Sequence, residues 1–484
     1  MSFFLEVVQS AFSPMVLFYM FAGVAAGICI GALPGLTATM GVALLLPLTF
    51  GMDATAGILM LLGIYVGAIY GGSISAILLH TPGTPASAAT AIDGYQFSKR
   101  GEAGRALGIA TLSSYVGGVV SVLCLWLISP QLAKLALKFS SAEFFLLAVF
   151  GLCIIANISG ENMAKGLICG FLGILTATVG IDSVTSYIRF TDNANLLSGI
   201  QYIPVMIGLF AMSQAFETIE DIYSTDEIDA SVTRLLPTKE DVKTILRVAP
   251  VTGLIGTMIG IIPGAGADIG SFVGYNTARG MSKHPEQFGK GSPEAVAASE
   301  GGNNGVTGGA MIPMLTLGVP GDAVAAIMIG ALTIQGLTPG PMLFKTNKVL
   351  VYTIFLGMFV ANTIMVLLGF SCIRLFTKVL SVPKTILTPV IFILCVVGSY
   401  AMRSNFYDVG TMLIAGVIGW LMGKVKILGL ILGPMAEKNF RTALLKSSGN
   451  PVVFFNTPIC WFFLALIAFT LFGAIRGQLK KKTN

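Results

Sequence analysis

The residues that could do chemistry in this chain cluster around two Pro-Gly pairs, Pro263-Gly264 and Pro320-Gly321, and each pair is followed by an acid, Asp268 or Asp322. Proline lacks the backbone N–H and glycine tolerates positive φ, so a Pro-Gly pair inside an apolar run predicts a broken helix. Free N–H groups at a helix start attract an anion, whereas carboxylates and free carbonyls attract a cation. The pattern therefore favours joint binding of an anion and a cation.

Between these pairs, Glu300, Asn303 and Asn304 stand among glycines in the segment EGGNNG. The two asparagines could bind a ligand at membrane depth, or they could belong to a glycine-rich turn outside the membrane. Asp268 and Asp322 also have two interpretations. They could be cation ligands, or they could be N-caps of helices that start at the membrane interface.

The first half of the chain repeats both Pro-Gly signatures in the same order. GALPGLTATMG, which starts at Gly31, aligns with GIIPGAGADIG, which starts at Gly260. In the second signature, Pro82-Gly83 aligns with Pro320-Gly321. This pattern indicates an internal duplication, and interrupted segments at corresponding positions of two halves point to the binding site of a transporter.

The duplicated signatures supply the candidate ligands. The predicted substrate-binding residues are Pro34, Gly35, Thr37, Ser73, Pro82, Gly83, Thr84, Gly264, Asn303, Asn304, Pro320 and Gly321. The predicted ligands of a coupling cation, Na⁺ or H⁺, are Thr39, Asp268 and Asp322. Any single hydroxyl among them could instead bond to its own helix. No nucleophile–base pair and no metal-ligand cluster stands out, so neither an enzyme nor a bound cofactor is expected.

The composition indicates the elements that must hold these residues. The chain is 55% hydrophobic and 11% charged, with a mean hydropathy of +0.84. Apolar runs of about 20 residues predict an all-α integral membrane protein with about 10–12 transmembrane helices plus broken or re-entrant helices. The runs do not alternate as barrel strands do. The net charge of +6 lies in loops and at the C-terminus, so it predicts cytoplasmic loops and no nucleic-acid partner.

The predicted organisation has four parts. They are a first transmembrane repeat (1–217), a hydrophilic cytoplasmic linker (218–247), a second transmembrane repeat (248–475) and a basic tail (476–484). Basic loop residues favour opposite orientations of the two repeats, since they follow the second signature in one half and lie between the signatures in the other. Lys345, Lys348 and the basic tail count against this inversion.

Several long motifs follow one another along the chain. They include PGLTATMGVALLLPLTFG (34–51), GIYVGAIYGGSISAILLHTPGTPASAATAIDGY (63–95), VGIDSVTSYIRFT (179–191), IPVMIGLFAMSQ (203–214), IIPGAGADIGSF (261–272) and GGAMIPMLTLGVPGDAVAAIMIGALTIQGLTPGP (308–341). In these motifs the chain resembles one known family, the large membrane subunits (TctA) of tripartite tricarboxylate transporters. The likeness runs from about residue 10 to 475. Gly301-Gly302 replace two alanines usual in the family, and 181–194 lacks its usual Pro and Gly.

This resemblance implies a multi-pass carrier of the bacterial inner membrane that imports carboxylates, such as citrate, by Na⁺ or H⁺ symport. It also implies two partners, a small TctB-like membrane subunit of about four helices and a periplasmic TctC-like solute-binding protein. An elevator-like movement is expected by analogy, and a homo-oligomer is left open. The alternatives are a stand-alone organic-anion carrier, a channel with unsaturable flux, and an intramembrane enzyme, for which no catalytic pair is visible.

Overall fold

The fold is helical, as the composition predicts. The structure is a computed structural model that describes residues 2–158, 163–182, 186–220, 235–380, 382–421 and 429–483. Within these ranges the β-structure is limited to β1 (Gly180–Ile181) and β2 (Ile188–Arg189), which pair antiparallel. The prediction of an all-α membrane protein is confirmed.

Ten helices precede residue 221 in the described part of the chain, and several are joined by short helical turns. They are α1 (Ser2–Ala11), α2 (Pro14–Ala32), α3 (Ala38–Leu45), α4 (Ala54–Leu79), α5 (Ala88–Lys99), α6 (Ala103–Ala136), α7 (Ser141–Ile158), α8 (Met163–Ala177), α9 (Tyr202–Met206) and α10 (Ser213–Glu220). The turns are η1 (Leu46–Thr49), η2 (Pro85–Ser87), η3 (Ala194–Leu196) and the π-helical η4 (Ile207–Met212), which joins α9 to α10.

The remaining elements follow residue 234. They are α11 (Lys239–Ile261), α12 (Ala267–Met281), η5 (Pro285–Gln287), α13 (Pro293–Leu317), α14 (Ala323–Ile334), α15 (Leu343–Thr346), α16 (Lys348–Ser371), α17 (Ile373–Val379), α18 (Lys384–Ala401), α19 (Phe406–Leu421), α20 (Gly429–Lys446), η6 (Pro451–Phe455) and α21 (Pro458–Thr483). Helix α21 continues through most of the predicted tail, and α11 begins inside the predicted linker. Most of that linker, 221–234, lies outside the described residues.

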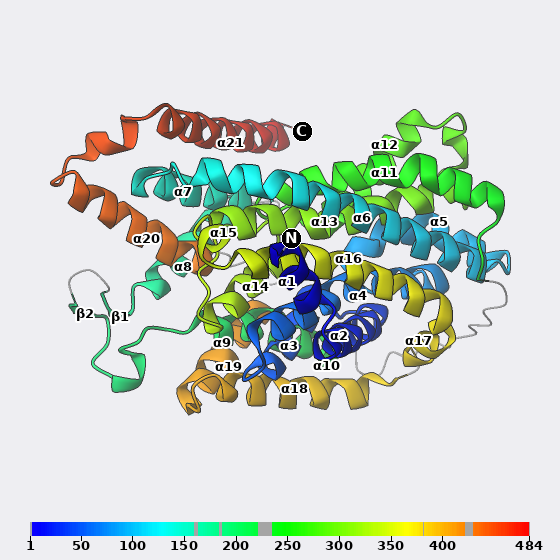
Figure 1. The fold of residues 1–484 in the computed structure, drawn as a ribbon, viewed down its shortest axis with the longest axis horizontal. Helices are drawn as coiled ribbons and strands as arrows, with labels where there is room; N and C mark the ends of the chain where they lie inside the picture. Colours follow the sequence, from blue (N-terminus) through cyan, green and yellow to red (C-terminus); the bar gives the residue numbers. More distant parts are fainter. Residues whose placement is uncertain are drawn as a thin grey trace.

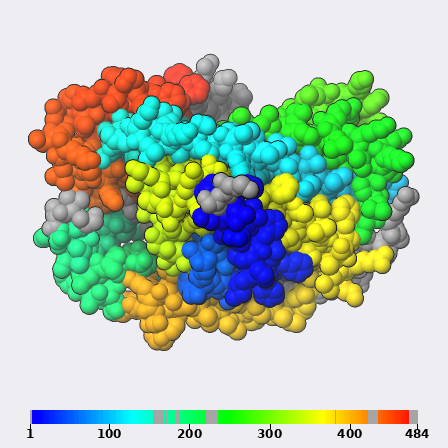
Figure 2. Space-filling view, viewed as in Figure 1, coloured from blue at the N-terminus to red at the C-terminus, as the bar shows by residue number. Residues whose placement is uncertain are grey.

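Six described helical segments are long and apolar enough to cross a membrane. They are α2, α4, α6, the continuous α9–η4–α10 segment, α11 and α16. Six further apolar helices are shorter, so the count of 10–12 stays a prediction. The N-terminal helices lie on the front face in Figure 2, and they expose Phe4, Phe12 and Phe18. Exposed apolar side chains of this kind suit contact with lipid.

Local sequence explains where these helices begin. Ser13 caps α2 by accepting a hydrogen bond from the backbone N–H of Val16, and Pro14 takes the first helical position. Thr238 and Asp241 form a reciprocal capping box at the start of α11. The same Asp241 carboxylate receives two hydrogen bonds, 2.8 and 2.9 Å long, from the Arg105 guanidinium on α6. This pairing holds α11 beside α6 (Figure 1).

Each half contains a long helix pair in which glycines permit close backbone contact. A Cβ on Gly31 of α2 would lie 2.1 Å from the Ala68 carbonyl oxygen of α4. A Cβ on Gly260 of α11 would lie 2.7 Å from the Val306 carbonyl oxygen of α13. Thus α2 packs on α4 as α11 packs on α13, and the contact glycines Gly31 and Gly260 occupy the same position in the aligned signatures.

The Pro-Gly pairs end or separate helices as predicted, but the EGGNNG segment does not break one. Helix α2 ends before Pro34 and α11 ends before Pro263, and a shorter helix follows each pair. In contrast, α13 runs unbroken from Pro293 to Leu317 through Asn303 and Asn304. The alternative of a glycine-rich turn outside the membrane is therefore wrong. The glycines of this segment serve close packing with α6, α11 and α12.

Candidate functional site

Elements from both halves meet around one cleft of about 400 Å³. It lies among α3, α4, the start of η2, the η4–α10 segment, α12 and α14. Six of the residues predicted from sequence line it: Thr37, Thr39, Thr84, Gly264, Asp268 and Asp322. These residues come from all four Pro-Gly signatures. The sequence alignment could only pair the signatures of the two halves, whereas the fold places residues of all four around one cleft.

Four helical segments start at this cleft. Thr37 caps α3 and Asp322 caps α14, and each side chain accepts a hydrogen bond from a backbone N–H three residues later. Thr84 precedes η2, and Gly266 precedes α12 without a side chain that could cap it. Converging helix starts direct N–H groups and partial positive charge into the cleft. This arrangement suits an anion.

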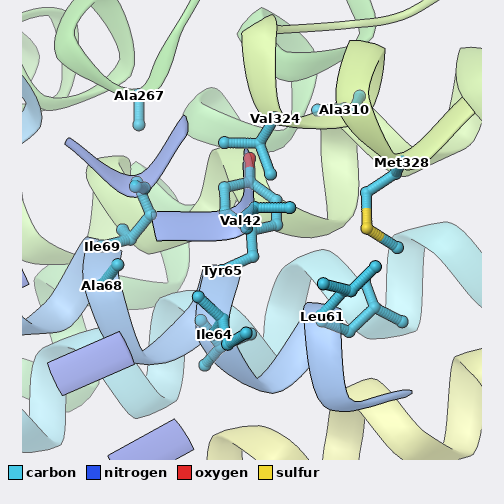
Figure 3. Packing of buried hydrophobic residues seen from close by; sticks show 14 of the residues in the cluster. Val42, Leu61, Ile64, Tyr65, Ala68, Ile69, Ala267, Ala310, Val324 and Met328 are labelled. Carbon is cyan, nitrogen blue, oxygen red and sulfur yellow. The ribbon is translucent and has the colours of Figure 1, made fainter. Parts of the chain in front are cut away.

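Asp322 joins the two halves at the edge of the cleft. The Tyr65 hydroxyl of α4 donates a hydrogen bond of 2.5 Å to its carboxylate, while the backbone N–H of Ala325 donates another, 2.7 Å long. Figure 3 shows the Tyr65 hydroxyl oxygen directed toward the segment that carries Val324. Tyr65 is fully buried, so this contact fixes the position of the carboxylate. Asp322 is therefore an N-cap that also lines the cleft, and its role as a cation ligand stays a prediction.

The cleft holds three acids and no base among its lining residues. Asp268 stands in the first turn of α12 and is partly buried, and Glu217 of α10 contributes the third carboxylate. Gln214 donates a hydrogen bond of 3.0 Å from its amide nitrogen to Glu217. Since Lys and Arg do not line this cleft, a cation would be attracted to it. A carboxylate would bind at the helix starts only where a cation offset the acids.

Thr84 is the first-half counterpart of Asp322 and leaves an unused polar atom at the cleft. Its side chain is 2% exposed, and its hydroxyl oxygen has no hydrogen-bond partner among the described residues. A buried hydroxyl without a partner costs about 1–3 kcal/mol. A bound substrate oxygen or cation would satisfy it. Thr39 also lines the cleft and is partly buried.

Comparison with known proteins identifies the family. The model of the tripartite tricarboxylate transporter TctA family matches residues 17–430. The chain belongs to this TctA family. It is therefore a multi-pass large membrane subunit of a tripartite transporter of the tricarboxylate type, in a system whose other components are of the TctB and TctC types.

Two relatives of this TctA chain come from Agrobacterium vitis. One, described as an uncharacterized 52.8 kDa protein in the TAR-I ttuC' 3'region, is 36% identical over 98% of this chain and 96% of its own length. The other, an uncharacterized protein in the TAR-II ttuC' 3'region, is 34% identical over 47% of this chain and 97% of its own length. No solved structure matches the chain.

Other residues predicted from sequence lie away from the cleft lining of this TctA chain. Ser73 is buried in α4, where its hydroxyl donates to the carbonyl of Tyr70. Asn303 and Asn304 are buried in α13. The lining also excludes Pro34, Gly35, Pro82, Gly83, Pro320 and Gly321, which shape the breaks instead.

Two glycines, one from the first signature of each half, have a definite backbone role. Gly35 and Gly264 have φ of +89° and +83°, a conformation that glycine adopts at little cost. Gly264 also donates its backbone N–H to the carbonyl of Gly321 at 2.8 Å, which connects the two breaks of the second half. The placement of Gly264 on the cleft therefore depends on the second signature as well as the first.

Proposed function

We propose that this chain imports carboxylates by symport with Na⁺ or H⁺, as the large subunit of a binding-protein-dependent transporter in a bacterial inner membrane. The small TctB-like subunit and a periplasmic TctC-like protein that delivers the substrate are its proposed partners. No cofactor takes part, because the cation gradient drives the transport.

One observation carries this proposal: four helix starts and three carboxylates surround one cleft that both halves build. Helix starts favour a carboxylate, and the acids favour a cation. Either ligand lowers the cost of binding the other, and that coupling is what symport requires. Broken helices around a shared site are the usual construction of secondary transporters.

The matched helix pairs support a movement of the breaks relative to a scaffold. In each half, the glycine of the second Pro-Gly pair packs on the carbonyl at the end of the first long helix, Gly83 on Gly31 and Gly321 on Gly260. Each pair of signatures would then move as one unit. An elevator-like movement of both units, in repeats of opposite orientation, is the mechanism we expect.

Uptake by proteoliposomes tests this function. They would contain the chain with its small partner subunit, and labelled citrate and other di- and tricarboxylates would be offered with and without the binding protein under Na⁺ or pH gradients. We expect saturable uptake that requires a cation gradient and the binding protein. Saturable uptake without the binding protein would support the stand-alone carrier, and gradient-independent, unsaturable flux would support a channel. Absence of uptake of every carboxylate by folded protein would reject the proposed substrate class.

Glu217→Gln is expected to weaken cation dependence without loss of fold. Glu217 is partly exposed and bonds to Gln214, so a glutamine keeps the size and removes one of three charges. Removing a charge from a partly hydrated site costs about 1–2 kcal/mol of cation affinity, or roughly tenfold in the cation concentration for half-maximal uptake. The matched control is Glu286→Gln, an exposed acid outside the cleft lining. Equal cation dependence in both variants would remove Glu217 from the site.

A further inference from the structure

A glutamate that the cleft does not use lies fully buried in the middle of α13. Glu300 has no exposed surface, and each carboxylate oxygen accepts a hydrogen bond from a hydroxyl of another helix. Thr90 of α5 donates at 2.5 Å and Ser114 of α6 donates at 2.7 Å. The Thr90 hydroxyl oxygen also lies 3.0 Å from the Ser299 hydroxyl oxygen. The first partners of this acid are therefore neutral.

No described base forms an ion pair with Glu300. Arg105 pairs with Asp241 and Glu102, while Arg247 pairs with Glu294. The titratable or charged groups on the elements packed around α13 are Tyr65 and Tyr70 on α4, Asp93, Tyr95 and Lys99 on α5, Arg105, Tyr115, Cys124 and Lys134 on α6, Lys239, Glu240, Asp241, Lys243 and Arg247 on α11, Asp268, Tyr275 and Arg279 on α12, Asp322 at the start of α14 and Lys345 on α15. Tyr70 is close enough to interact electrostatically with Glu300.

An ionised carboxylate in such surroundings is costly, so it requires a bound proton or a cation. The local packing favours the proton. Gly301, the next residue, lies against the backbone of α6, where a Cβ on Gly117 would meet the Gly301 carbonyl oxygen at 2.3 Å. A sodium ion needs several oxygens around it and space of its own, whereas a proton needs neither.

The neighbouring amide offers the acceptor that a protonated acid needs. Asn303 follows Glu300 by three residues and lies beside it, yet neither atom of its side-chain amide makes a hydrogen bond of normal geometry with a described residue. A carboxylic acid has an O–H to donate, which a carboxylate lacks. Protonated Glu300 could donate to the Asn303 oxygen, and this would satisfy an atom that is otherwise unpaired in the core.

A row of hydroxyl residues leads from the cleft toward Glu300. The Ser87 hydroxyl donates to the Thr84 carbonyl, and the described residues show no direct hydrogen bond between the hydroxyls of the row. Thr84 lines the cleft, and Ser87 and Thr90 follow it at intervals of three residues along η2 and α5. The Thr84 and Ser87 oxygens lie 2.3 and 3.0 Å from the position that a Cβ on Gly72 would occupy, so they are near neighbours. Thr90 then donates directly to Glu300. Each hydroxyl can accept one proton and donate another.

We propose that Glu300 binds the coupling proton of this carrier, and that the proton reaches it from the cleft through Thr84, Ser87 and Thr90. A proton from cleft water enters the row, and water molecules bridge the hydroxyls that do not bond directly. Each hydroxyl or bridging water passes one proton onward as it accepts another, and the carboxylate becomes a neutral acid. No hydroxyl keeps a charge, and no bond other than O–H forms or breaks. This inference rests on the proposed symport and assigns one of its cations.

The test compares Glu300→Gln with wild type in the reconstituted complex. Glutamine resembles the protonated acid, so exchange of labelled for unlabelled carboxylate should stay within about twofold of wild type, whereas uptake driven by a pH gradient should fall by about tenfold or more. The matched control, Glu143→Gln, changes another buried glutamate held by hydroxyls, those of Ser140 and Thr457, and should keep proton-driven uptake.

An infrared measurement keeps the proposal testable if Glu300→Gln does not fold. Thr90→Val removes one hydroxyl donor and interrupts the row, so it should slow proton-driven uptake more than exchange. In wild type, the difference spectrum between high and low pH should contain the C=O band of a buried carboxylic acid, shifted in Thr90→Val. Proton-driven uptake that survives Glu300→Gln, or a spectrum without this band, would overturn the proposal. Wild-type uptake that follows Na⁺ alone would also overturn it and leave the carboxylate symport intact, whereas absence of uptake would reject symport itself.

Discussion

Gly321→Ala is expected to destabilise the carrier strongly and to abolish transport. An alanine Cβ at this position would lie 2.3 Å from the Gly260 carbonyl oxygen of α11 and 2.5 Å from the Ala310 Cα of α13, so the backbone at residue 321 would have to move away from both helices. Overpacking of a core costs about 1–3 kcal/mol, and contact with backbone allows little relief, so we expect at least about 3 kcal/mol. Thermal unfolding of the purified protein in detergent measures the loss of stability. Carboxylate uptake by proteoliposomes made from the protein that stays soluble measures the loss of transport.

A matched control separates this packing effect from the general effect of an added methyl group. Gly410 lies in α19, and nothing stands within 4 Å of the position of its Cβ, so Gly410→Ala should keep or raise the melting temperature. Gly83→Ala should behave like Gly321→Ala, because its Cβ would meet the Gly31 carbonyl oxygen at 2.0 Å. Equal melting temperatures for Gly321→Ala and Gly410→Ala would refute the close contact.

A loss of stability in Gly321→Ala would also change the explanation for why glycine stands at this position. The sequence suggests that a larger residue at Gly321 or Gly83 blocks the approach of substrate to the backbone. The structure instead places each glycine against the carbonyl at the end of the first long helix of its half, Gly31 of α2 or Gly260 of α11, and outside the cleft lining. Contacts within the protein keep the shape of the break, and we expect the substrate to bind at the helix starts that follow it.

Sequence patterns predicted the fold class and part of the site because both rest on local chemistry. Long apolar runs predict membrane helices, and Pro34-Gly35 or Pro263-Gly264 predicts where one must end. Alignment of the halves then selected Thr37, Thr39, Asp268 and Asp322, which line the cleft. The unbroken course of α13 through Asn303 and Asn304 was harder to predict, because glycine-rich polar sequence usually forms loops, whereas here packing of α13 against three helices overrides that preference.

Tyr65 and Glu217 could not be found in this way, since neither belongs to a Pro-Gly signature. Tyr65 stands far from Asp322 in sequence, and only the packing of α4 beside α14 joins them. Glu217 ends an apolar run and resembles the first charge of the linker. Its place on the cleft depends on η4, because the wider π-helical turn alters which side chains of α10 face inward. The printed sequence carries no clear signal of that turn.

Asp322→Asn is expected to produce the largest loss of cation coupling while the protein stays folded. Asparagine caps helices about as well as aspartate, so its Oδ1 can still accept from the Ala325 N–H, while its amide nitrogen, in place of Oδ2, can donate to the Tyr65 hydroxyl oxygen. Both contacts can therefore be kept while the charge is lost, at a side chain 6% exposed. A charge pair at partly hydrated depth contributes about 3 kcal/mol, so the cation concentration for half-maximal uptake should rise roughly a hundredfold.

The matched control for Asp322→Asn is Asp53→Asn, which changes another N-cap aspartate, at the exposed start of α4 outside the cleft lining. It should leave cation dependence unchanged.

Asp268→Asn should have an intermediate effect, about tenfold, because this acid is more hydrated and lacks the fixed contact with Tyr65. Since α14 stays capped in Asp322→Asn, the melting temperature of this variant should remain near that of the wild-type protein. If cation dependence is unchanged in both cleft variants, the acids do not bind the coupling ion and the attraction of the cleft for cations has no role in transport.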